Sequence, residues 1–287
     1  MMFKNLLVPL TCVANKGLLL KFSASTICTK TSLDNEDKGI TIVSLDYPKN
    51  KNALNKESVQ SLSNAFEEIS TDSNTRVVIL RSLVPRVFCA GADLKERLTL
   101  SDSEIKSFLN KLNELMFKVE ECPVPVISSI DGAALGGGLE LALASDIRIA
   151  SEVAKIGLLE TKLAILPGAG GTQRLTRLVG SSLAKELIFT ARVLNGIQAK
   201  ELGIVNHVTK DPETAFQKAI EIAREILPNG PLGVKYAKLA INKGKEVDIY
   251  QGCAIEGLCY SQVIPTKDRL EGLKAFVEKR KPDYKGV

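Results

Sequence analysis

The sequence predicts an α/β fold, because segments with the pattern of strands alternate with segments that have the pattern of helices. Residues 39–47 alternate apolar and polar side chains, as a strand does. Residues 51–69 repeat apolar side chains at helical spacing, and residues 75–82 form a second apolar strand. Strands separated by helices are typical of an α/β core. With 287 residues, 45% of them hydrophobic, the chain is long enough to bury such a core.

A long amphipathic helix is predicted at residues 101–121. It opens with a Ser-x-x-Glu capping box, formed by Ser101 and Glu104. Residues 122–130 follow as a buried strand that opens with two prolines. The apolar side chains of the helix recur on one face, which we expect to pack on the core: Ile105, Phe108, Leu112, Leu115, Met116 and Val119.

The second half of the chain changes from alternating elements to helices. Strands are predicted at residues 145–151, 154–160 and 204–208, and everything after residue 231 has helical character. We therefore expect a core at residues 34–230. A helical C-terminal region at residues 231–287 should lie against a neighbour, either the same chain or another subunit.

Residues 1–33 have the composition of a mitochondrial transit peptide. They contain Lys4, Lys16, Lys21 and Lys30, several serine and threonine residues, and no acidic residue. A mitochondrial matrix protein is therefore expected, with a secretory signal or a floppy terminus as alternatives. No apolar run approaches the roughly 20 residues that a membrane-spanning helix needs, so no membrane insertion is expected. The net charge of +5 comes in good part from this segment and gives little argument for nucleic acid binding.

Spacing argues against several classes of site. The six cysteines form no C-x-x-C pair and no cluster with the single histidine, His207, so neither a metal site nor a disulfide framework is predicted. The chain has no G-x-S-x-G motif and no Walker A motif. Its glycines also do not form a dinucleotide fingerprint with an acidic residue at the right distance. Serine hydrolysis, nucleotide hydrolysis and nicotinamide chemistry are therefore disfavoured.

Three consecutive glycines, Gly136–Gly138, stand in the otherwise apolar stretch GAALGGGLELALASD at residues 132–146. If a helix begins near Leu139, the N–H groups before it are unpaired and point at whatever lies beyond the helix start. A second N–H from the turn at residues 90–92 would complete the donor pair that an oxyanion hole needs. The alternative is that the glycines only permit close packing of a helix on a strand.

Two glutamates on apolar backgrounds are candidates for proton transfer. Glu140 lies one turn inside the presumed helix, and Glu160 follows a strand-like segment. Burial of a carboxylate raises its pKa, which suits acid–base work near neutral pH. The alternatives are a helix N-terminal acid stabilised by the dipole for Glu140 and a capping acid for Glu160.

The chain resembles the crotonase superfamily, specifically the enoyl-CoA hydratases. The segments that carry the resemblance are FCAGADLKE at residues 88–96, DGAALGGGLELALASDIRIAS at residues 131–151 and GLLETKLAILPGAGGTQRL at residues 157–175. It looks most like the mitochondrial branch that contains an AU-rich-RNA-binding methylglutaconyl-CoA hydratase and enoyl-CoA hydratase domain-containing proteins. The resemblance implies a spiral of repeated β-β-α turns. It also implies a C-terminal helical trimerisation region, with trimers often stacked as hexamers.

The resemblance also implies roles at matched positions. The N–H groups of Ala92 and Gly137 correspond to the oxyanion hole for a thioester oxygen, and Glu140 and Glu160 to an acid–base pair. An acyl-CoA thioester is the implied substrate, with no cofactor, because CoA enters as part of the substrate. The implied CoA- and substrate-binding positions are Ala90, Asp93, Leu94, Lys95 and Gly136.

The predicted function is hydration of a short-chain or branched 2-enoyl-CoA, with 3-methylglutaconyl-CoA from leucine breakdown as one option. Arg97 and Lys162 are candidate partners for a second carboxylate on such a substrate, and solvated surface charge is the alternative for both. An enoyl-CoA isomerase, AU-rich RNA binding and an idle scaffold are the other hypotheses. The predicted helix at 101–121 carries three lysines against four glutamates, so it makes a weak phosphate-binding face.

Overall fold

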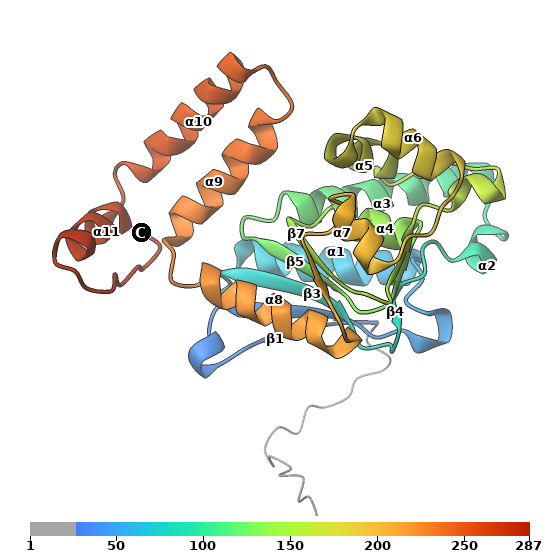
Figure 1. Cartoon of the computed structure of the whole chain (residues 1–287), viewed down its shortest axis with the longest axis horizontal. Coiled ribbons are helices and arrows are strands. Elements are labelled where there is room, and N and C mark those ends of the chain that lie inside the picture. The colour runs from blue at the N-terminus through green and yellow to red at the C-terminus, as the bar shows by residue number, and fades with distance from the viewer. Residues whose placement is uncertain (1–26) are drawn as a thin grey trace, which may run out of the picture.

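The computed structural model describes residues 27–287, in which strands and helices alternate as the sequence predicts (Figure 1). Residues 1–26, with most of the predicted transit peptide, lie outside the described part. The strands are β1 (Cys28–Ser32), β2 (Ile40–Leu45), β3 (Val77–Ser82), β4 (Val87–Cys89), β5 (Val126–Ile130), β6 (Ala133–Leu135), β7 (Ile147–Ser151), β8 (Lys155–Gly157) and β9 (His207–Thr209).

The helices include the predicted one at 101–121, whose capping box between Ser101 and Glu104 is confirmed. Short 3-10 turns occur at η1 (Asn35–Asp37), η2 (Pro48–Asn50) and η3 (Glu160–Leu163). The α-helices are α1 (Lys56–Thr71), α2 (Leu94–Arg97), α3 (Asp102–Glu120), α4 (Gly137–Leu143), α5 (Gly171–Val179), α6 (Ser181–Phe189), α7 (Gly196–Glu201), α8 (Pro212–Ile226), α9 (Pro231–Gly244), α10 (Ile249–Val263) and α11 (Lys267–Val277).

The strands form two sheets, and the chain visits them in turn. The larger sheet has the order β1-β2-β3-β5-β7-β9, and the smaller has the order β4-β6-β8. All pairs are parallel except β1 with β2. Each of β3, β5 and β7 joins the larger sheet, and the strand that follows it joins the smaller one. The chain therefore advances as a spiral of β-β-α turns, and the predicted fold is confirmed.

The larger sheet is buried on both faces. α8 covers one face, where Ala215, Ala219 and Ala223 recur once per turn and are fully buried. Small side chains at this spacing let the helix approach the sheet closely. The other face joins the main core, in which Phe66 of α1 and Met116 of α3 are buried. This core fixes the position of the smaller sheet, whose strands lead into the candidate site.

The folded core begins earlier than predicted. β1 pairs antiparallel with β2 at the edge of the larger sheet, with Cys28 opposite Leu45 and Ser32 opposite Thr41. The described fold therefore includes residues before the boundary predicted between residues 33 and 34, and where a transit peptide ends stays a prediction. The segment CTKTS is mostly polar because four of its five side chains are partly or fully exposed at the sheet edge, so it lacks the apolar pattern that reveals an inner strand. The last strand was also displaced, since β9 occupies 207–209 rather than 204–208.

The C-terminal region is helical, as predicted, and extends away from the sheets (Figure 1). α9 is tied to the core by an ion pair between Lys238 Nζ and Asp146 Oδ2 at 2.7 Å. Both groups are mostly buried, and Lys238 also donates to the carbonyl oxygen of Val124. None of the helices within residues 27–287 is long and apolar enough to cross a membrane.

Candidate active site

The turn after β4 presents a backbone N–H that has no partner in its own loop. Leu54 N–H donates to the carbonyl oxygen of Gly91 at 2.7 Å, and Asp93 N–H donates to the carbonyl oxygen of Leu54 at 3.0 Å. These two bonds flank Ala92 in an isolated parallel bridge with Leu54, so the N–H of Ala92 points away from Leu54. The turn therefore offers one free donor at Ala92.

The start of α4 offers a second donor. The helix begins at Gly137, two residues earlier than predicted. Gly136 N–H donates to the carbonyl oxygen of Gly157 at 2.8 Å, and the N–H groups of Leu139 and Glu140 return to the carbonyl oxygen of Gly136. The N–H of Gly137 precedes these first helical bonds, so it is one of the donors that a helix start leaves unpaired.

The two donors lie close to each other and to a carboxylate. A Cβ placed on Gly137 would lie 3.7 Å from the nitrogen of Ala92 and 3.8 Å from Oε2 of Glu140. A Cβ placed on Gly91 would lie 3.4 Å from the nitrogen of Gly137. The space beside Gly137 is therefore bordered by both amides and by Glu140. Two convergent N–H groups are the arrangement that stabilises a developing oxyanion.

The glycine run combines both readings that the sequence allowed. A Cβ on Gly138 would overlap the carbonyl oxygen of Cys89, so Gly138 permits close packing of α4 on β4. Gly136 has a φ of 52°, which glycine adopts without strain, and a Cβ there would lie 3.0 Å from Oε1 of Glu160. Gly137 faces the site. Close packing therefore explains Gly138, and the site explains Gly136 and Gly137.

Glu140 is held in place by backbone donors on another segment. Its side chain is only 2% exposed, and Oε1 accepts hydrogen bonds from the N–H groups of Ala169 and Gly171, each at 2.8 Å. Burial raises the pKa of the Glu140 carboxyl to about 7, against the opposite effect of those two bonds. With Oε1 fixed in this way, Oε2 is turned towards Gly137.

The second candidate carboxylate, Glu160, lies beside Gly136. It is half-buried at the start of η3, and its Oε2 is buried without a hydrogen-bond partner among residues 27–287. Burial raises the pKa of the Glu160 carboxyl, and its charge in turn raises the pKa of Glu140. The charge of Glu160 therefore influences whether Glu140 holds a proton. A buried acceptor with no partner is the feature expected of a site that receives a ligand or water.

Four of the five predicted CoA- and substrate-binding positions lie in the turn that carries the Ala92 donor, and the fifth, Gly136, directly precedes α4. Asp93 caps α2 by accepting from the N–H of Lys95 at 3.1 Å, and it accepts from Nδ2 of Asn50 at 2.7 Å. Ala90, Leu94 and Lys95 are exposed. Asp93 therefore shapes the loop through its carboxylate, while CoA binding by these residues stays a prediction.

Sequence reasoning missed the two amides that hold Glu140. Gly168, Gly170 and Gly171 form a second glycine cluster in the sequence, and sequence reasoning gave it no role. A Cβ on Gly171 would lie 2.9 Å from Oε1 of Glu140, so glycine is needed there for the carboxylate to reach the N–H. The available signal was a glycine cluster directly before a helix, combined with an isolated carboxylate in an apolar run that required donors elsewhere.

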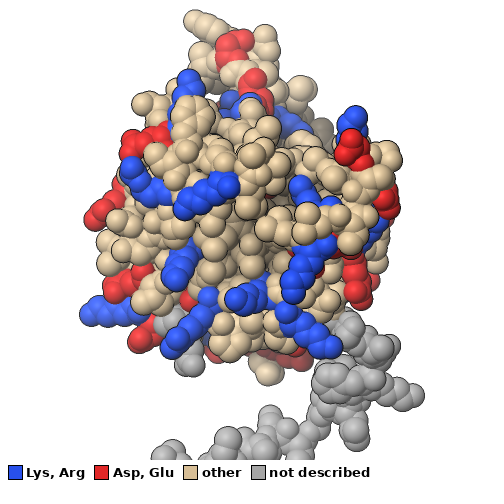
Figure 2. All heavy atoms as spheres, turned by 90° about the vertical axis from the view of Figure 1, so that its right-hand side faces the viewer, with Lys and Arg blue, Asp and Glu red and all other residues tan. Residues whose placement is uncertain are grey.

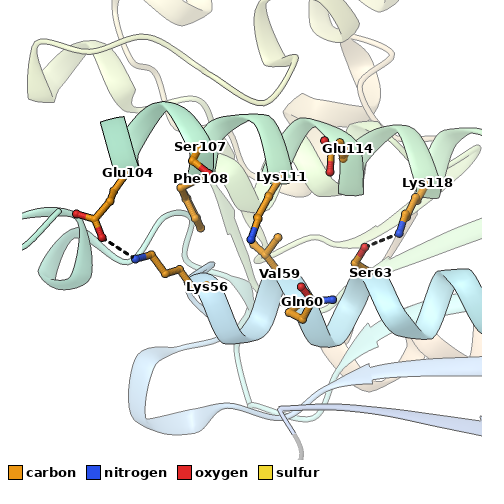
Figure 3. A pocket seen from close by; sticks show the side chains of 10 residues that line it. All are labelled: Lys56, Val59, Gln60, Ser63, Glu104, Ser107, Phe108, Lys111, Glu114 and Lys118. Atoms are coloured by element: carbon orange, nitrogen blue, oxygen red, sulfur yellow. Dashed lines mark hydrogen bonds and ion pairs between the residues drawn. The ribbon is translucent and has the colours of Figure 1, made fainter. Parts of the chain in front are cut away.

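A groove of about 360 Å³ lies between α1 and α3, and none of the predicted site residues lines it (Figure 3). Its lysines are largely matched by acids. Lys56 Nζ lies 3.3 Å from Oε1 of Glu104, and Lys118 donates to Ser63 at 2.8 Å and pairs with Glu67 at 3.0 Å. This mixture of charges gives no support to the RNA-binding alternative. In the part of the chain that the structure describes, no group of His, Cys, Asp and Glu side chains is arranged to hold a metal ion.

Comparisons with known proteins show which family the chain resembles. A family model for enoyl-CoA hydratase/isomerase matches residues 35–287. Mitochondrial methylglutaconyl-CoA hydratase of Homo sapiens is 54% identical over 257 residues, covering 88% of this chain and 76% of that protein. Probable enoyl-CoA hydratase 2, mitochondrial, of Arabidopsis thaliana is 52% identical over 271 residues, covering 94% and 90%.

A solved structure shows the same fold. The crystal structure of an enoyl-CoA hydratase from Bacillus anthracis matches with a TM-score of 0.87 and 46% identity, covering 91% of this chain and 100% of that one. The family model spans both sheets except β1, together with the C-terminal helices, and the resemblance predicted from the sequence is confirmed. The chain therefore belongs to the enoyl-CoA hydratase/isomerase family.

Proposed function

We propose that this chain adds water across the double bond of a short-chain or branched 2-enoyl-CoA to give a 3-hydroxyacyl-CoA. The observation that carries the proposal is a pair of carboxylates, the buried Glu140 and the half-buried Glu160, beside the free N–H groups of Ala92 and Gly137. The names of similar proteins support it, because they include enoyl-CoA hydratases and a methylglutaconyl-CoA hydratase.

The two amides supply the electrophilic activation. Conjugation makes C3 of a 2-enoyl thioester electrophilic only to the extent that negative charge on the thioester oxygen is stabilised. Donors from Ala92 and Gly137 are fixed by the backbone before substrate arrives, so they need no reorganisation as that charge develops. Removal of one such donor typically costs about 100-fold or more in rate.

The carboxylates supply the proton transfers. Glu140 and Glu160 hold a water molecule between them, and its oxygen bonds to C3 while its proton passes to one carboxylate. The other carboxylate gives a proton to C2, so the pair has the same number of protons before and after the reaction. We assign water activation to Glu140 and protonation of C2 to Glu160, as the resemblance implies. This chemistry needs no metal or redox group, and CoA enters as part of the substrate.

The two-carboxylate arrangement favours hydration over the shift of a double bond. A shift moves one proton from one carbon to another, for which one carboxylate is enough. Support comes from the position of the two carboxylates at adjacent glycines, Glu140 at Gly137 and Glu160 at Gly136, and from Oε2 of Glu160, which is buried without a partner in the described chain. A second carboxylate takes part in the reaction only if water is a reactant, because hydration needs two proton transfers.

The surface beside α2 suits the anionic CoA part of the substrate. Figure 2 shows lysine and arginine side chains spread over the face on which α2 and α6 lie. CoA carries several phosphate charges, which such a face attracts. We propose that CoA lies along the loop at residues 90–95, with Lys95 at a phosphate.

The C-terminal helices carry the surface through which copies of the chain would associate. α9, α10 and α11 expose many large apolar side chains, among them Ile249, Tyr250, Leu258 and Phe276. Surfaces of this kind mark contacts with another protein. We propose that residues 231–287 join copies of the chain into a trimer or a pair of stacked trimers.

We also propose a location in the mitochondrial matrix. Several relatives are described as mitochondrial, and the basic composition of the N-terminal residues agrees with this location.

Activity is expected to depend on pH in the range where the pair holds one proton. Burial disfavours the charged carboxylate, so Glu140 keeps a proton until the pH rises to about 7. Glu140 can therefore act as the base for water only as the pH approaches that value, and at high pH Glu160 loses the proton that C2 requires. We therefore expect kcat/KM for crotonyl-CoA to fall on both sides of an optimum. A profile that is flat from pH 5 to pH 9 would contradict the paired role.

The direct test of the function uses purified protein that comprises residues 27–287. It is incubated with crotonyl-CoA or with 3-methylglutaconyl-CoA, and the loss of enoyl-thioester absorbance is measured. The expected result is consumption of at least one substrate and formation of the matching 3-hydroxyacyl-CoA. A folded protein that consumes neither thioester would overturn the proposal.

A further inference from the structure

The position of the Glu140 carboxylate depends on residues 168–171, the segment before and at the start of α5, which we call the donor loop. The N–H groups of Ala169 and Gly171 in this loop both donate to Oε1 of Glu140 at 2.8 Å. The carbonyl groups of Gly168 and Ala169 accept hydrogen bonds from side chains on two helices. The direction of the two N–H groups therefore depends on those side chains.

Asn113 of α3 holds the peptide unit that donates the first of these bonds. Its Nδ2 donates to the carbonyl oxygen of Gly168 at 2.8 Å and to that of Leu109 at 2.9 Å. The carbonyl of Gly168 and the N–H of Ala169 belong to one planar peptide unit, so a bond that orients the carbonyl also orients the N–H. A bonded carbonyl also polarises its N–H, which strengthens the bond to Glu140. Asn113 is therefore one peptide unit away from the carboxylate.

Arg174 of α5 holds the next peptide unit. Its Nη1 donates to the carbonyl oxygen of Ala169 at 3.1 Å. Gly170 has a φ of 92°, and a Cβ there would overlap Nη1 of Arg174, so glycine leaves the space that the guanidinium occupies. This peptide unit lies between the two that donate to Glu140. Its orientation therefore sets how the two N–H groups are spaced.

A carboxylate of α3 fixes Arg174 in this place. Oε2 of Glu120 accepts from Nε and Nη2 of Arg174 at 3.0 and 2.7 Å. The two side chains are only 21% and 12% exposed, so water screens the pair little, unlike a surface ion pair. Oε1 of Glu120 in turn lies 2.9 Å from Nζ of Lys245, directly after α9. A chain of contacts therefore runs from α9 and α3 through Arg174 to the donor loop.

Arg177, one turn further along α5, offers a matched comparison. It also pairs with a glutamate, since its Nη2 lies 3.1 Å from Oε2 of Glu246, but its side chain is 48% exposed. Its Nη1 donates to the carbonyl oxygen of Gln173 rather than to the donor loop. The two arginines therefore share a helix and a type of ion pair, and they differ in their relation to the donor loop.

We propose that Arg174 and Asn113 are positioning residues for Glu140, which hold the donor loop so that Oε1 is fixed and Oε2 stays turned towards Gly137. Both act through the loop and neither touches the reacting atoms. This inference rests on the proposed function, because it explains how the base of that reaction is kept in place.

The same contacts affect the affinity of Glu140 for a proton. Burial raises the pKa of Glu140 to about 7, and the charge of Glu160 also raises it. The hydrogen bonds from Gly171 and Ala169 and the charge of Arg174 lower it. Loss of these contacts therefore raises the pKa of Glu140 further. The acid side of the kcat/KM profile, on which Glu140 must lose its proton to act as the base, should then move to higher pH.

The first test measures kcat, KM and the pH profile for the better thioester substrate of the wild type. In Arg174→Gln, kcat at the pH optimum should fall by roughly 10- to 100-fold, the size expected when a reacting group is misplaced, while KM changes little. The acid side of the profile should move to higher pH. Asn113→Leu should show the same pattern with a smaller pH shift, because it removes no charge. Arg174→Lys should reverse part of the pH shift, and Arg177→Gln should match the wild type.

A double variant separates positioning from a purely structural role. If Arg174 acts through Glu140, adding Arg174→Gln to Glu140→Gln should lower kcat little beyond the loss that Glu140→Gln causes alone. An equal fold-loss in both backgrounds would overturn the inference. So would an Arg174→Gln protein with lower thermal stability but wild-type kcat and pH profile. A wild type that consumes neither crotonyl-CoA nor 3-methylglutaconyl-CoA would instead overturn the proposed function, and this inference with it.

Discussion

Glu140→Gln is expected to lower kcat for hydration of crotonyl-CoA by roughly 10²- to 10⁴-fold, the range that a positioned acid–base group contributes. The amide oxygen of glutamine can still accept from the N–H groups of Ala169 and Gly171, so the side chain should keep its place. What it loses is the ability to take up or release a proton beside the water. Steady-state kinetics at the pH optimum, with circular dichroism to confirm folding, measures the change.

Glu160→Gln should have an effect of similar size, because each carboxylate handles one of the two proton transfers. The double variant should be only slightly worse than either single variant, since groups that act as a unit lose their contribution together. If either single variant keeps more than a tenth of the wild-type kcat, the paired mechanism is contradicted.

Gly137→Ala is expected to reduce kcat/KM by about 100-fold while the protein stays folded, because the new methyl group occupies space beside both oxyanion donors. The Cβ would lie 3.7 Å from the nitrogen of Ala92 and 3.8 Å from Oε2 of Glu140. Its tightest contact is Cδ1 of Leu54 at 3.2 Å, which a small side-chain movement relieves. Alanine also favours the start of a helix over glycine. Kinetics and thermal unfolding of the same sample measure the two effects.

Gly138→Ala is the neighbouring control and should show the opposite pattern. A Cβ there overlaps the backbone carbonyl of Cys89, which cannot move aside without disturbing β4. We expect a loss of about 1–3 kcal/mol in the free energy of unfolding, the usual cost of overpacking. A Gly137→Ala protein that is fully active would show that the space beside Gly137 is not where the thioester oxygen binds.

The sequence was sufficient for most elements of the fold because their signals are local. The apolar spacing and the capping box of α3 depend on residues within one helix, and both are confirmed. β1 was missed because CTKTS is an edge strand, and its pairing with β2 depends on a partner rather than on its own pattern. The start of α4 was placed two residues late, because glycine has low helix propensity and only the tertiary contacts of Gly137 and Gly138 explain its use there.

The residue types of the candidate site could be predicted from the sequence, but the groups that hold them in position could not. Glu140 and Glu160 stand out as carboxylates in apolar runs, and the resemblance paired them with the amides of Ala92 and Gly137. The N–H groups that hold Glu140 come from residues about thirty positions away, a relation that no local pattern encodes. The same holds for Arg97, whose buried Nε and contact with Phe108 depend on how α2 packs against α3.

Isotopic analysis of the product tests the central claim most directly. Crotonyl-CoA is incubated with the wild-type protein in water labelled with oxygen-18 and deuterium, and the product is analysed by mass spectrometry and NMR. A site in which Glu140 and Glu160 share one water should give 3-hydroxybutyryl-CoA with one solvent oxygen at C3 and one deuterium at C2, and both glutamine variants should lose the two labels together. Incorporation of deuterium into the thioester without any solvent oxygen would show proton transfer alone, and would contradict the hydratase account in favour of an isomerase.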